Sequence, residues 1–341
     1  MNPASAQVRS PAPPSPACVA YLRSKANSAG VLNYRDFVEA VLYAPELGYY
    51  ARTDIKRVGL TAGRDFYTAS SLGGGIFGRL VRTAAVNLLA PEIPGDYALV
   101  EMAAEPGAGV FGDDAAPFAR VETRRLIDSI NPPERAVVFA NEWLDAQPFH
   151  RFVFRRGGWR ELGVRIHGES LEDIELPEFS STALLLSENL PPEAPEDYHL
   201  DLSLDAEKSL RELIATPWRG CLILSDYGYD WAELIHHRPA GTARAYFHHA
   251  VSGDLLAQPG EQDLTCHVCW DRLEAVLTQE GFTNVRVERQ EAFFMRHASA
   301  EIEGIMAQQA GKFSPARQTL LELLHPAHLG QKFQVLSARR V

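Results

Sequence analysis

Short apolar runs alternate with stretches of helical spacing along most of the chain. The runs with the clearest strand character lie at 97–102, 136–140 and 221–225. Apolar residues at helical spacing predict helices at 17–43, 72–90, 206–214 and 271–279. Buried strands that alternate with helices favour an α/β fold built on a largely parallel, doubly wound sheet.

The same pattern predicts how the chain is divided. Residues 1–16 are rich in Pro, Ala and Ser and are expected to form a disordered tail, because such a segment buries too little apolar surface to order itself. Residues 17–90 are expected to form an N-terminal helical cap segment, and residues 91–341 the α/β domain. An insertion at about 151–205 begins with a β-hairpin, predicted where two strand-like runs flank Gly157-Gly158.

Composition and charge narrow the class of protein. The 341 residues are 46% hydrophobic and 23% charged, which allows a sizeable core. The formal net charge of −11 disfavours nucleic acids and anionic membranes as partners and makes a cationic partner easier to bind. Four cysteines are too few for a disulfide framework, and no apolar run reaches the roughly 18 residues of a membrane span. The N-terminus has no signal-peptide pattern, so we expect a cytoplasmic protein.

Polar side chains follow three of the predicted strands. They are Glu101 and Glu105, Asn141 and Glu142, and Asp226 and Tyr227. Ligands of open α/β sheets bind at the edge where parallel strands end. Acidic and amide groups gathered there suit a polar, hydroxyl-bearing, partly cationic ligand. A nucleoside that carries a sulfonium fits this description, and so do several other ligands.

A series of short motifs occurs along the chain in a fixed order. The motifs read Tyr-Ala-Pro at 43–45, Leu-Gly-Tyr-Tyr at 47–50, Asp-Phe-Tyr-Thr-Ala at 65–69, Phe-Gly at 77–78, Asn-Glu-Trp-Leu-Asp-Ala-Gln-Pro at 141–148 and Asp-Tyr-Gly at 226–228. They continue with Gly241-Thr242, Arg244, Tyr246, His249, Pro259-Gly260, Asp263-Leu264-Thr265 and His267-Val268. Over about residues 30–337 the series resembles the MidA-like S-adenosylmethionine (SAM)-dependent methyltransferases. That family includes the mitochondrial complex I assembly methyltransferase, which modifies a protein arginine.

The resemblance implies a class I SAM-methyltransferase (Rossmann-like) fold, S-adenosylmethionine as the cofactor, and a protein side chain, arginine by family, as the methyl acceptor. For cofactor binding it implies Asp65, Phe66, Thr68, Glu101, Ala103, Glu105, Gly107, Gly109 and Asn141. For catalysis and acceptor binding it implies Asn141, Glu142, Asp145, Asp226, Tyr227 and His267. Methyl transfer is an in-line displacement, so such residues act mainly by positioning, and a carboxylate can hold a guanidinium through two hydrogen bonds.

The cofactor half of this site departs from the family pattern in two ways. Ala103 and Glu105 stand where the family has glycines, which permit close approach of the backbone to a ligand and positive φ. The interval from Glu101 to Asn141 is only 40 positions, too short for the two further strands and helices that a class I methyltransferase normally fits there. We therefore expect a sheet shortened between its first and fourth strands. Asp113, Asp114 and Glu122 are candidates in this interval for an acid that holds a ribose, and none is well placed.

Several of these residues also have a purely structural interpretation. Residues 141–142 suit a helix start, Gly228 suits a turn with positive φ, and His267 suits a core position. Cys-His-Val-Cys at 266–269 resembles half of a zinc site without a second ligand pair, so no metal is expected. The departures in the cofactor loop, residues 103–109, leave a second function open, that of a catalytically inactive protein-binding or assembly module.

Overall fold

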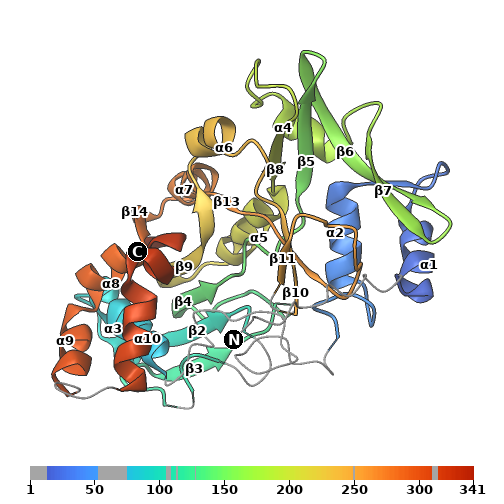
Figure 1. Ribbon diagram of the computed structural model, residues 1–341. Helices are drawn as coiled ribbons and strands as arrows, with labels where there is room; N and C mark the ends of the chain where they lie inside the picture. Colours follow the sequence, from blue (N-terminus) through green and yellow to red (C-terminus); the bar gives the residue numbers. More distant parts are fainter. Residues whose placement is uncertain are drawn as a thin grey trace, which may run out of the picture.

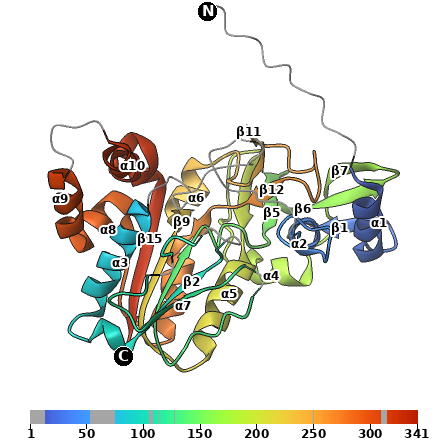
Figure 2. The ribbon, with the colours of Figure 1, turned by 90° about the horizontal axis from the view of Figure 1, so that it is seen from below.

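The computed structural model describes residues 14–52, 75–104, 109–112, 114–126, 128–248, 250–308 and 314–341. Two large sheets divide the chain (Figure 1). The main sheet and the helices around it form one part, and the second sheet with the two N-terminal helices forms the other (Figures 1 and 2). No helix within these described ranges is long and apolar enough to cross a membrane.

The main sheet has seven strands in the order β14-β15-β9-β4-β2-β3, with β13 beside the end of β9. Its strands are β2 (Ala98–Met102), β3 (Arg120–Thr123), β4 (Arg135–Asn141), β9 (Arg219–Tyr229), β13 (Val268–Cys269), β14 (Thr283–Arg289) and β15 (Phe333–Arg340). Strands β3, β2, β4 and β9 are parallel, and β15 runs antiparallel to both of its neighbours. Since β3 and β4 lie on opposite sides of β2, the strand order reverses there, and this is the point at which such sheets bind ligands.

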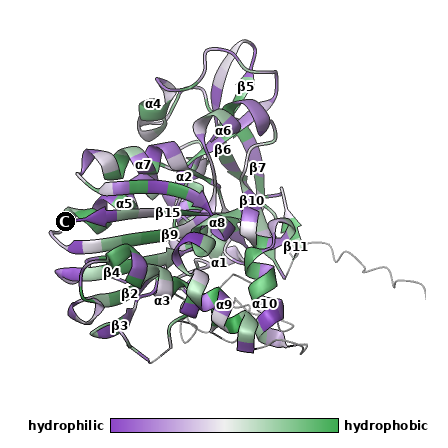
Figure 3. Ribbon diagram, turned by 90° about the vertical axis from the view of Figure 1, so that its left-hand side faces the viewer, coloured by the Kyte–Doolittle hydropathy of each residue, from purple (hydrophilic) through white to green (hydrophobic). Residues whose placement is uncertain are grey.

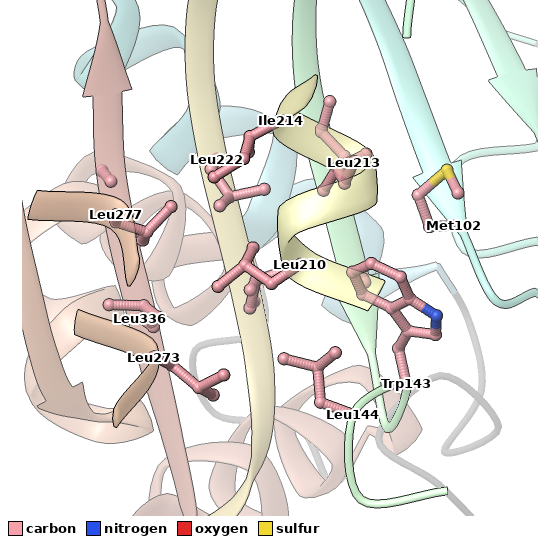
Figure 4. Close-up of a cluster of buried hydrophobic side chains, with 14 of the residues drawn as sticks. Met102, Trp143, Leu144, Leu210, Leu213, Ile214, Leu222, Leu273, Leu277 and Leu336 are labelled. Atoms are coloured by element: carbon pink, nitrogen blue, oxygen red, sulfur yellow. The ribbon is translucent and has the colours of Figure 1, made fainter. Parts of the chain in front are cut away.

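Helices cover both faces of the main sheet. One face carries α5 (Leu204–Ala215) and α7 (Trp270–Gln279), and the other carries α3 (Ile76–Leu89), α8 (Gln290–His297), α9 (Ser299–Gln308) and α10 (Pro315–Leu324). Figure 4 shows the first layer, where Leu210 of α5 and Leu273 of α7 pack together over the sheet. The central strands are almost wholly buried between these layers, and Figure 3 shows how much of them is hydrophobic.

The second sheet is antiparallel and has five strands, in the order β1-β6-β5-β8 with β7 beside β6. Its strands are β1 (Val31–Asn33), β5 (His150–Arg155), β6 (Gly158–His167), β7 (Ser170–Glu175) and β8 (Tyr198–Leu202). The predicted hairpin is the β5–β6 pair, and its turn residues Arg156 and Gly157 both have positive φ, of 53° and 70°.

Four helices pack on the two faces of the second sheet. They are α1 (Pro16–Lys25) and α2 (Tyr34–Tyr43) on one face, and α4 (Ser181–Ser187) and α6 (Trp231–His237) on the other. Alternate residues of β5 pack into the helix layers on the two faces of the sheet, since Val153 faces α2 while Phe152 faces α4. A three-stranded sheet, in the order β11-β10-β12, lies against α2. Its strands are β10 (Arg244–Phe247), β11 (Ala250–Ser252) and β12 (Asp263–Thr265).

The predicted fold class is confirmed. The main sheet is doubly wound and is shortened as expected, because β3 is the only strand among the described residues between β2 and β4. Asn33 caps α2 with a side-chain oxygen that accepts the N–H of Asp36. Residues 17–43 form two helices with β1 between them, where Gly30 turns the chain with a φ of +72°.

The chain is divided differently from the predicted segments in two places. Pro16 is the first residue of α1, so this helix begins inside the predicted tail, of which residues 1–13 lie outside the described ranges. Helix α3, from the predicted cap segment 17–90, packs into the core of the main sheet, whereas α1 and α2 pack with the second sheet. Strands β5 to β8 of the second sheet occupy 150–202, close to the predicted insertion at about 151–205.

Candidate active site

A buried carboxylate on β9 holds the loop that follows β4. One oxygen of Asp226, Oδ2, accepts the backbone N–H groups of Leu144 at 2.9 Å and of Asp145 at 3.3 Å. The other oxygen accepts the N–H of Tyr227 at 2.8 Å. Burial raises the pKa of Asp226 to about 7, against the lowering effect of these N–H donors. Asp226 therefore connects two neighbouring strands of the main sheet at the edge where the ligand is expected.

Asp145, held in place by that contact, is buried without a matching set of donors. Its side chain is buried, and its Oδ1 atom has no hydrogen-bond partner among the described residues. Burial raises the pKa of Asp145 well above its usual range, and the nearby charges of Asp226, Glu142 and Asp263 raise it further. A buried carboxyl oxygen that lacks a donor is costly, and a bound cation or N–H group would remove that cost.

The two residues at the end of β4 stand beside this carboxyl group. The side-chain amide of Asn141 donates to Oε1 of Glu142 at 2.8 Å, while Oδ1 of Asn141 is buried and has no partner in the described part of the chain. Glu142 has a φ of +51°, which L-residues rarely adopt, and its N–H donates to the carbonyl of Ser225 at 2.9 Å. Such backbone strain is concentrated at functional sites in proteins, and here it turns the chain at the end of β4.

Four tyrosines, from α2, the loop after it, β9 and β10, surround the acidic group, which is formed by Asp145, Glu142, Asp226 and Asp263. Tyr43 and Tyr50 stack with ring centroids 5.6 Å apart, and the hydroxyl of Tyr50 donates to Asp263 at 2.9 Å. Burial raises the pKa of Tyr246 to about 12, and the charges of Asp145, Glu142 and Asp263 add to the effect. Burial likewise raises the pKa of Tyr227, and the charge of Glu142 is its next contribution. Tyr43 and Tyr50 also feel the charge of Asp145, so all four rings lie near this carboxyl group.

Three of these four tyrosines, together with Asp263, were not among the predicted site residues. Tyr43, Tyr50, Tyr246 and Asp263 all belong to the motifs that carry the family resemblance, so the sequence held a signal for them. What it lacked was a role, because they come from α2, the loop after it, β10 and β12. Only the fold brings these elements together at one end of the main sheet.

His267 lies behind Tyr227 in a layer of rings. Its imidazole stacks on Tyr229 with centroids 5.0 Å apart and lies 5.8 Å from the ring of Tyr227. Burial lowers the pKa of His267 to about 4, although a hydrogen bond to the backbone of Thr242 acts in the opposite direction. His267 is therefore neutral at physiological pH. The geometry suits it to support Tyr227, and a catalytic role for His267 remains a prediction.

On the cofactor side, Glu101 is directed at the loop backbone. Both of its carboxylate oxygens lie near the N–H of Val110, at 3.1 and 3.0 Å. Burial raises the pKa of Glu101 to about 7, against hydrogen bonds from the backbone of Val110 and Phe111. Gly109 fits tightly here, since a Cβ atom would lie 3.1 Å from Glu101 Oε2 and 3.2 Å from Thr123 Oγ1. Glu101 thus fixes the returning end of the cofactor loop.

Ala103 occupies a left-handed conformation, with a φ of +60°. Glycine adopts this conformation without steric cost, and the family pattern expected from the sequence has glycine at this position. The other predicted cofactor residues, Glu105, Gly107, Asp65, Phe66 and Thr68, lie outside the described residues.

The segment between β3 and β4 closes the sheet without a further strand in its described part. Glu122 of β3, a candidate acid for holding a ribose, pairs instead with Arg120 at 2.8 Å and with Arg124 at 2.7 Å. Beyond it, residues 128–131 and Trp143 line a pocket of about 380 Å³ that Gln147 and Tyr43 also border. Small-molecule sites in proteins begin at about this volume.

No group of three or more His, Cys, Asp or Glu side chains is arranged to hold a metal among the residues that the structure describes. Cys266 and Cys269 are buried, and burial raises the pKa of the Cys269 thiol to about 12. Cys221 is buried separately in the core of the main sheet.

The expectation that Gly228 has a positive φ in a turn was wrong. Gly228 pairs with Val268 in the sheet, and a Cβ there would lie 2.3 Å from Nε1 of Trp270.

Comparison with known proteins indicates the class of protein. Residues 120–287 match the family described as "Putative S-adenosyl-L-methionine-dependent methyltransferase". The chain is 22% identical to the mitochondrial protein arginine methyltransferase NDUFAF7 of Danio rerio, a match that covers 93% of this chain and 85% of the relative. It is 23% identical to the Drosophila melanogaster homologue, over 93% of this chain and 83% of the relative.

Two solved structures from Burkholderia thailandensis have the same fold. One, bound to S-adenosyl-homocysteine, is 26% identical, covers 95% of this chain and 92% of its own, and gives a TM-score of 0.80. The other is a native crystal structure with 25% identity, coverage of 95% and 91%, and a TM-score of 0.76. The likeness extends through both sheets, since almost all of each chain is matched.

Proposed function

We propose that this SAM-dependent methyltransferase transfers the methyl group of SAM to an arginine side chain of a partner protein. Two observations support arginine as the acceptor. The relatives that match 93% of this chain are named protein arginine methyltransferases. The acidic group around Asp145 offers carboxylates and aromatic rings to a planar cation.

The unpartnered oxygen of Asp145 carries this proposal. A guanidinium has five N–H donors in a rigid plane, and it can satisfy Oδ1 of Asp145 while its charge offsets the repulsion from Glu142 and Asp226. The half-buried rings of Tyr227 and Tyr246 suit stacking against such a plane. A lysine ammonium brings the charge without the plane, so the rings and the carboxylates together favour arginine.

The cofactor fits the strand ends on the other side of Asn141. SAM supplies an electrophilic methyl group on a sulfonium when it is bound. Oδ1 of Asn141 is a buried acceptor without a partner in the described residues, which suits an amine or hydroxyl of such a ligand. Ala103, with its left-handed backbone, begins the loop at the end of β2, next to β4 in the sheet. The position is the reversal point of the strand order.

The residues of the chain act mainly by orientation and by proton handling. One guanidinium nitrogen forms the bond to the methyl carbon as the sulfur–carbon bond breaks, and that nitrogen then gives up one proton. The carboxyl group of Asp145 is suited to hold the guanidinium and to accept this proton, because burial raises its pKa. Asp226 keeps the 144–145 backbone in place through its contacts with two N–H groups.

Replacing Asp145 by Asn tests the proposal directly. With radiolabelled SAM and peptides that contain one arginine, we expect the D145N variant to lose about 100-fold in kcat/KM. Its Kd for SAM, measured by calorimetry, should stay close to that of the parent. The matched control is Glu172→Gln, which removes an exposed carboxylate that pairs with Arg165 on the second sheet, and it should leave both quantities unchanged.

The outcomes separate the possible functions. Arginine transfer that survives D145N unchanged would contradict the role given to Asp145. Equal or faster transfer to lysine peptides would contradict the choice of acceptor. If the parent protein shows no heat with millimolar SAM and no transfer to any peptide, the protein is an inactive assembly module.

A further inference from the structure

Strand β11 forms an exposed edge beside the acidic site. In the part of the chain that the structure describes, β11 pairs on one side only, with β10. Its three residues are exposed, and Val251 keeps 60% of its surface in contact with solvent although it is apolar. Figure 2 shows β11 at the periphery of the ribbon. An exposed strand edge carries free N–H and C=O groups and is a ready template for another extended chain.

One face of the three-stranded sheet connects this edge to the acidic site. Tyr246 of β10 lies opposite both Val251 of β11 and Asp263 of β12, so the three side chains form a row on the same face. Asp263, at the inner end, is buried and accepts the hydroxyl of Tyr50. Tyr246, in the middle, is influenced by the charge of Asp145. The row thus leads from buried carboxylates to an exposed apolar side chain.

The register of the hairpin determines which backbone groups face outward. Phe247 and Ala250 are the partners next to the two-residue turn of the hairpin, and His248 follows Phe247 with a φ of +46°. The pair next to such a turn exchanges hydrogen bonds, and the following pair does not. Tyr246 and Val251 are that following pair. The N–H and C=O of Val251 therefore point toward the open edge.

We propose that an extended segment of the methyl-acceptor protein adds to β11 as a further strand, with its cationic side chain directed past Tyr246 to the carboxylates around Asp145. This inference rests on the proposed function and identifies how the acceptor is held. Main-chain hydrogen bonds to Val251 supply affinity with little dependence on sequence, and the acidic site selects the cation. Charge argues for a cationic occupant, because the carboxyl groups of Asp263, Asp145 and Glu142 lie together at the inner end of the row and the molecule carries a net charge of −11.

Two substitutions at one position test the proposal. Val251→Pro removes the outward N–H and leaves the N–H groups that face β10, whereas Val251→Ala keeps the backbone and removes only the side chain. We expect V251P to raise the KM of a peptide long enough to cover β11 by about tenfold, and V251A to change it much less. N-acetyl-arginine amide is too short to reach β11, so its kcat/KM should be the same in all three proteins.

A second measurement uses the parent protein and does not depend on the folding of any variant. Peptides carrying a single N-methyl group on successive backbone nitrogens should bind with alternating affinity, because only every second N–H of an added strand faces β11. Equal affinity at all positions, or an unchanged KM in a folded V251P, would overturn the proposal. Failure of the proposed function looks different, since the parent would then methylate neither the long peptide nor N-acetyl-arginine amide.

Discussion

Asp145 and Asp226 are neighbouring buried carboxyl groups with different surroundings. Asp226 accepts three backbone N–H groups, which stabilise its ionised form, whereas Oδ1 of Asp145 meets no donor among the described residues. Mutual repulsion therefore places the proton preferentially on Asp145 when the site is empty. A cation that enters replaces this proton, and the carboxylate that is left can bind it. Asp226 therefore positions the loop, and Asp145 contacts the acceptor.

Glu101 should give the stability of the protein a pH dependence of its own. Burial raises its pKa from an ordinary 4.5 to about 7, so the folded protein binds this proton more tightly than the unfolded chain. The stability from this group is fully present below about pH 4.5 and is lost as the pH rises to about 7. The loss should approach about 3 kcal/mol. In urea unfolding, Glu101→Gln should remove this part of the slope, and parallel pH curves for the two proteins would contradict the assignment.

Ala103 stores strain that glycine would release. A left-handed alanine costs roughly 1 kcal/mol, so Ala103→Gly should stabilise the protein by up to about that amount in urea unfolding. Ala104 is the matched control, because its φ is not positive and glycine there only adds freedom to the unfolded chain. Ala104→Gly should therefore destabilise the protein by about 0.5 kcal/mol. The same sign for both variants would show that Ala103 is not strained.

At the scale of elements, α3 supports the cofactor loop through a contact that only glycine permits. A Cβ atom on Gly78 would lie 2.0 Å from the carbonyl oxygen of Val110, the residue whose N–H binds Glu101. Gly78→Ala must therefore push α3 away from the 109–111 segment. We expect it to destabilise the protein by about 1–3 kcal/mol. The affinity for SAM, measured by calorimetry, should fall about tenfold.

Gly304 supplies the control for that substitution. It lies in the interior of α9, and a Cβ atom there would meet nothing within 4 Å. Alanine is the better helix former, so Gly304→Ala should stabilise the protein by about 0.5–1 kcal/mol and leave SAM binding unchanged. If both glycine variants behave alike, the close approach of α3 to Val110 is not important.

The sequence predicted the strands well and their polar ends less well. The run at 221–225 was expected to end before Asp226, but β9 continues to Tyr229. It continues because Asp226 finds donors in the loop after β4, and because β15 and β13 still pair with it there. Gly228 was read as a turn residue for the same reason. A single sequence shows that Asp226 is polar, but not that the neighbouring strand supplies its donors.

At the scale of the whole molecule, the acceptor side of the site is shared between the two parts of the fold. The main sheet supplies Asn141 and Asp226, while α2 and the three-stranded sheet supply Tyr43 and Tyr246. The sequence predicted the first group from strand ends, a local signal. It gave the tyrosines no role, because their contacts join residues about 100 or more positions apart, as in the bond from Tyr43 to the carbonyl of Ala146 at 2.7 Å. Hydrophobic periodicity predicts which residues of one element share a face, and it gives no information on pairs from distant elements.

The net charge of the molecule should appear in the salt dependence of acceptor binding. A chain with a charge of −11 attracts a cationic peptide over distances that salt screens, since the Debye length is about 10 Å at 0.1 M and about 3 Å at 1 M. The KM of a peptide with one arginine and no other charge should rise about threefold between low and high salt. The same peptide with citrulline in place of arginine keeps the shape and loses the charge, so its inhibition constant should not change with salt. A KM for the arginine peptide that is equally insensitive would mean that the acidic site contributes shape alone to recognition.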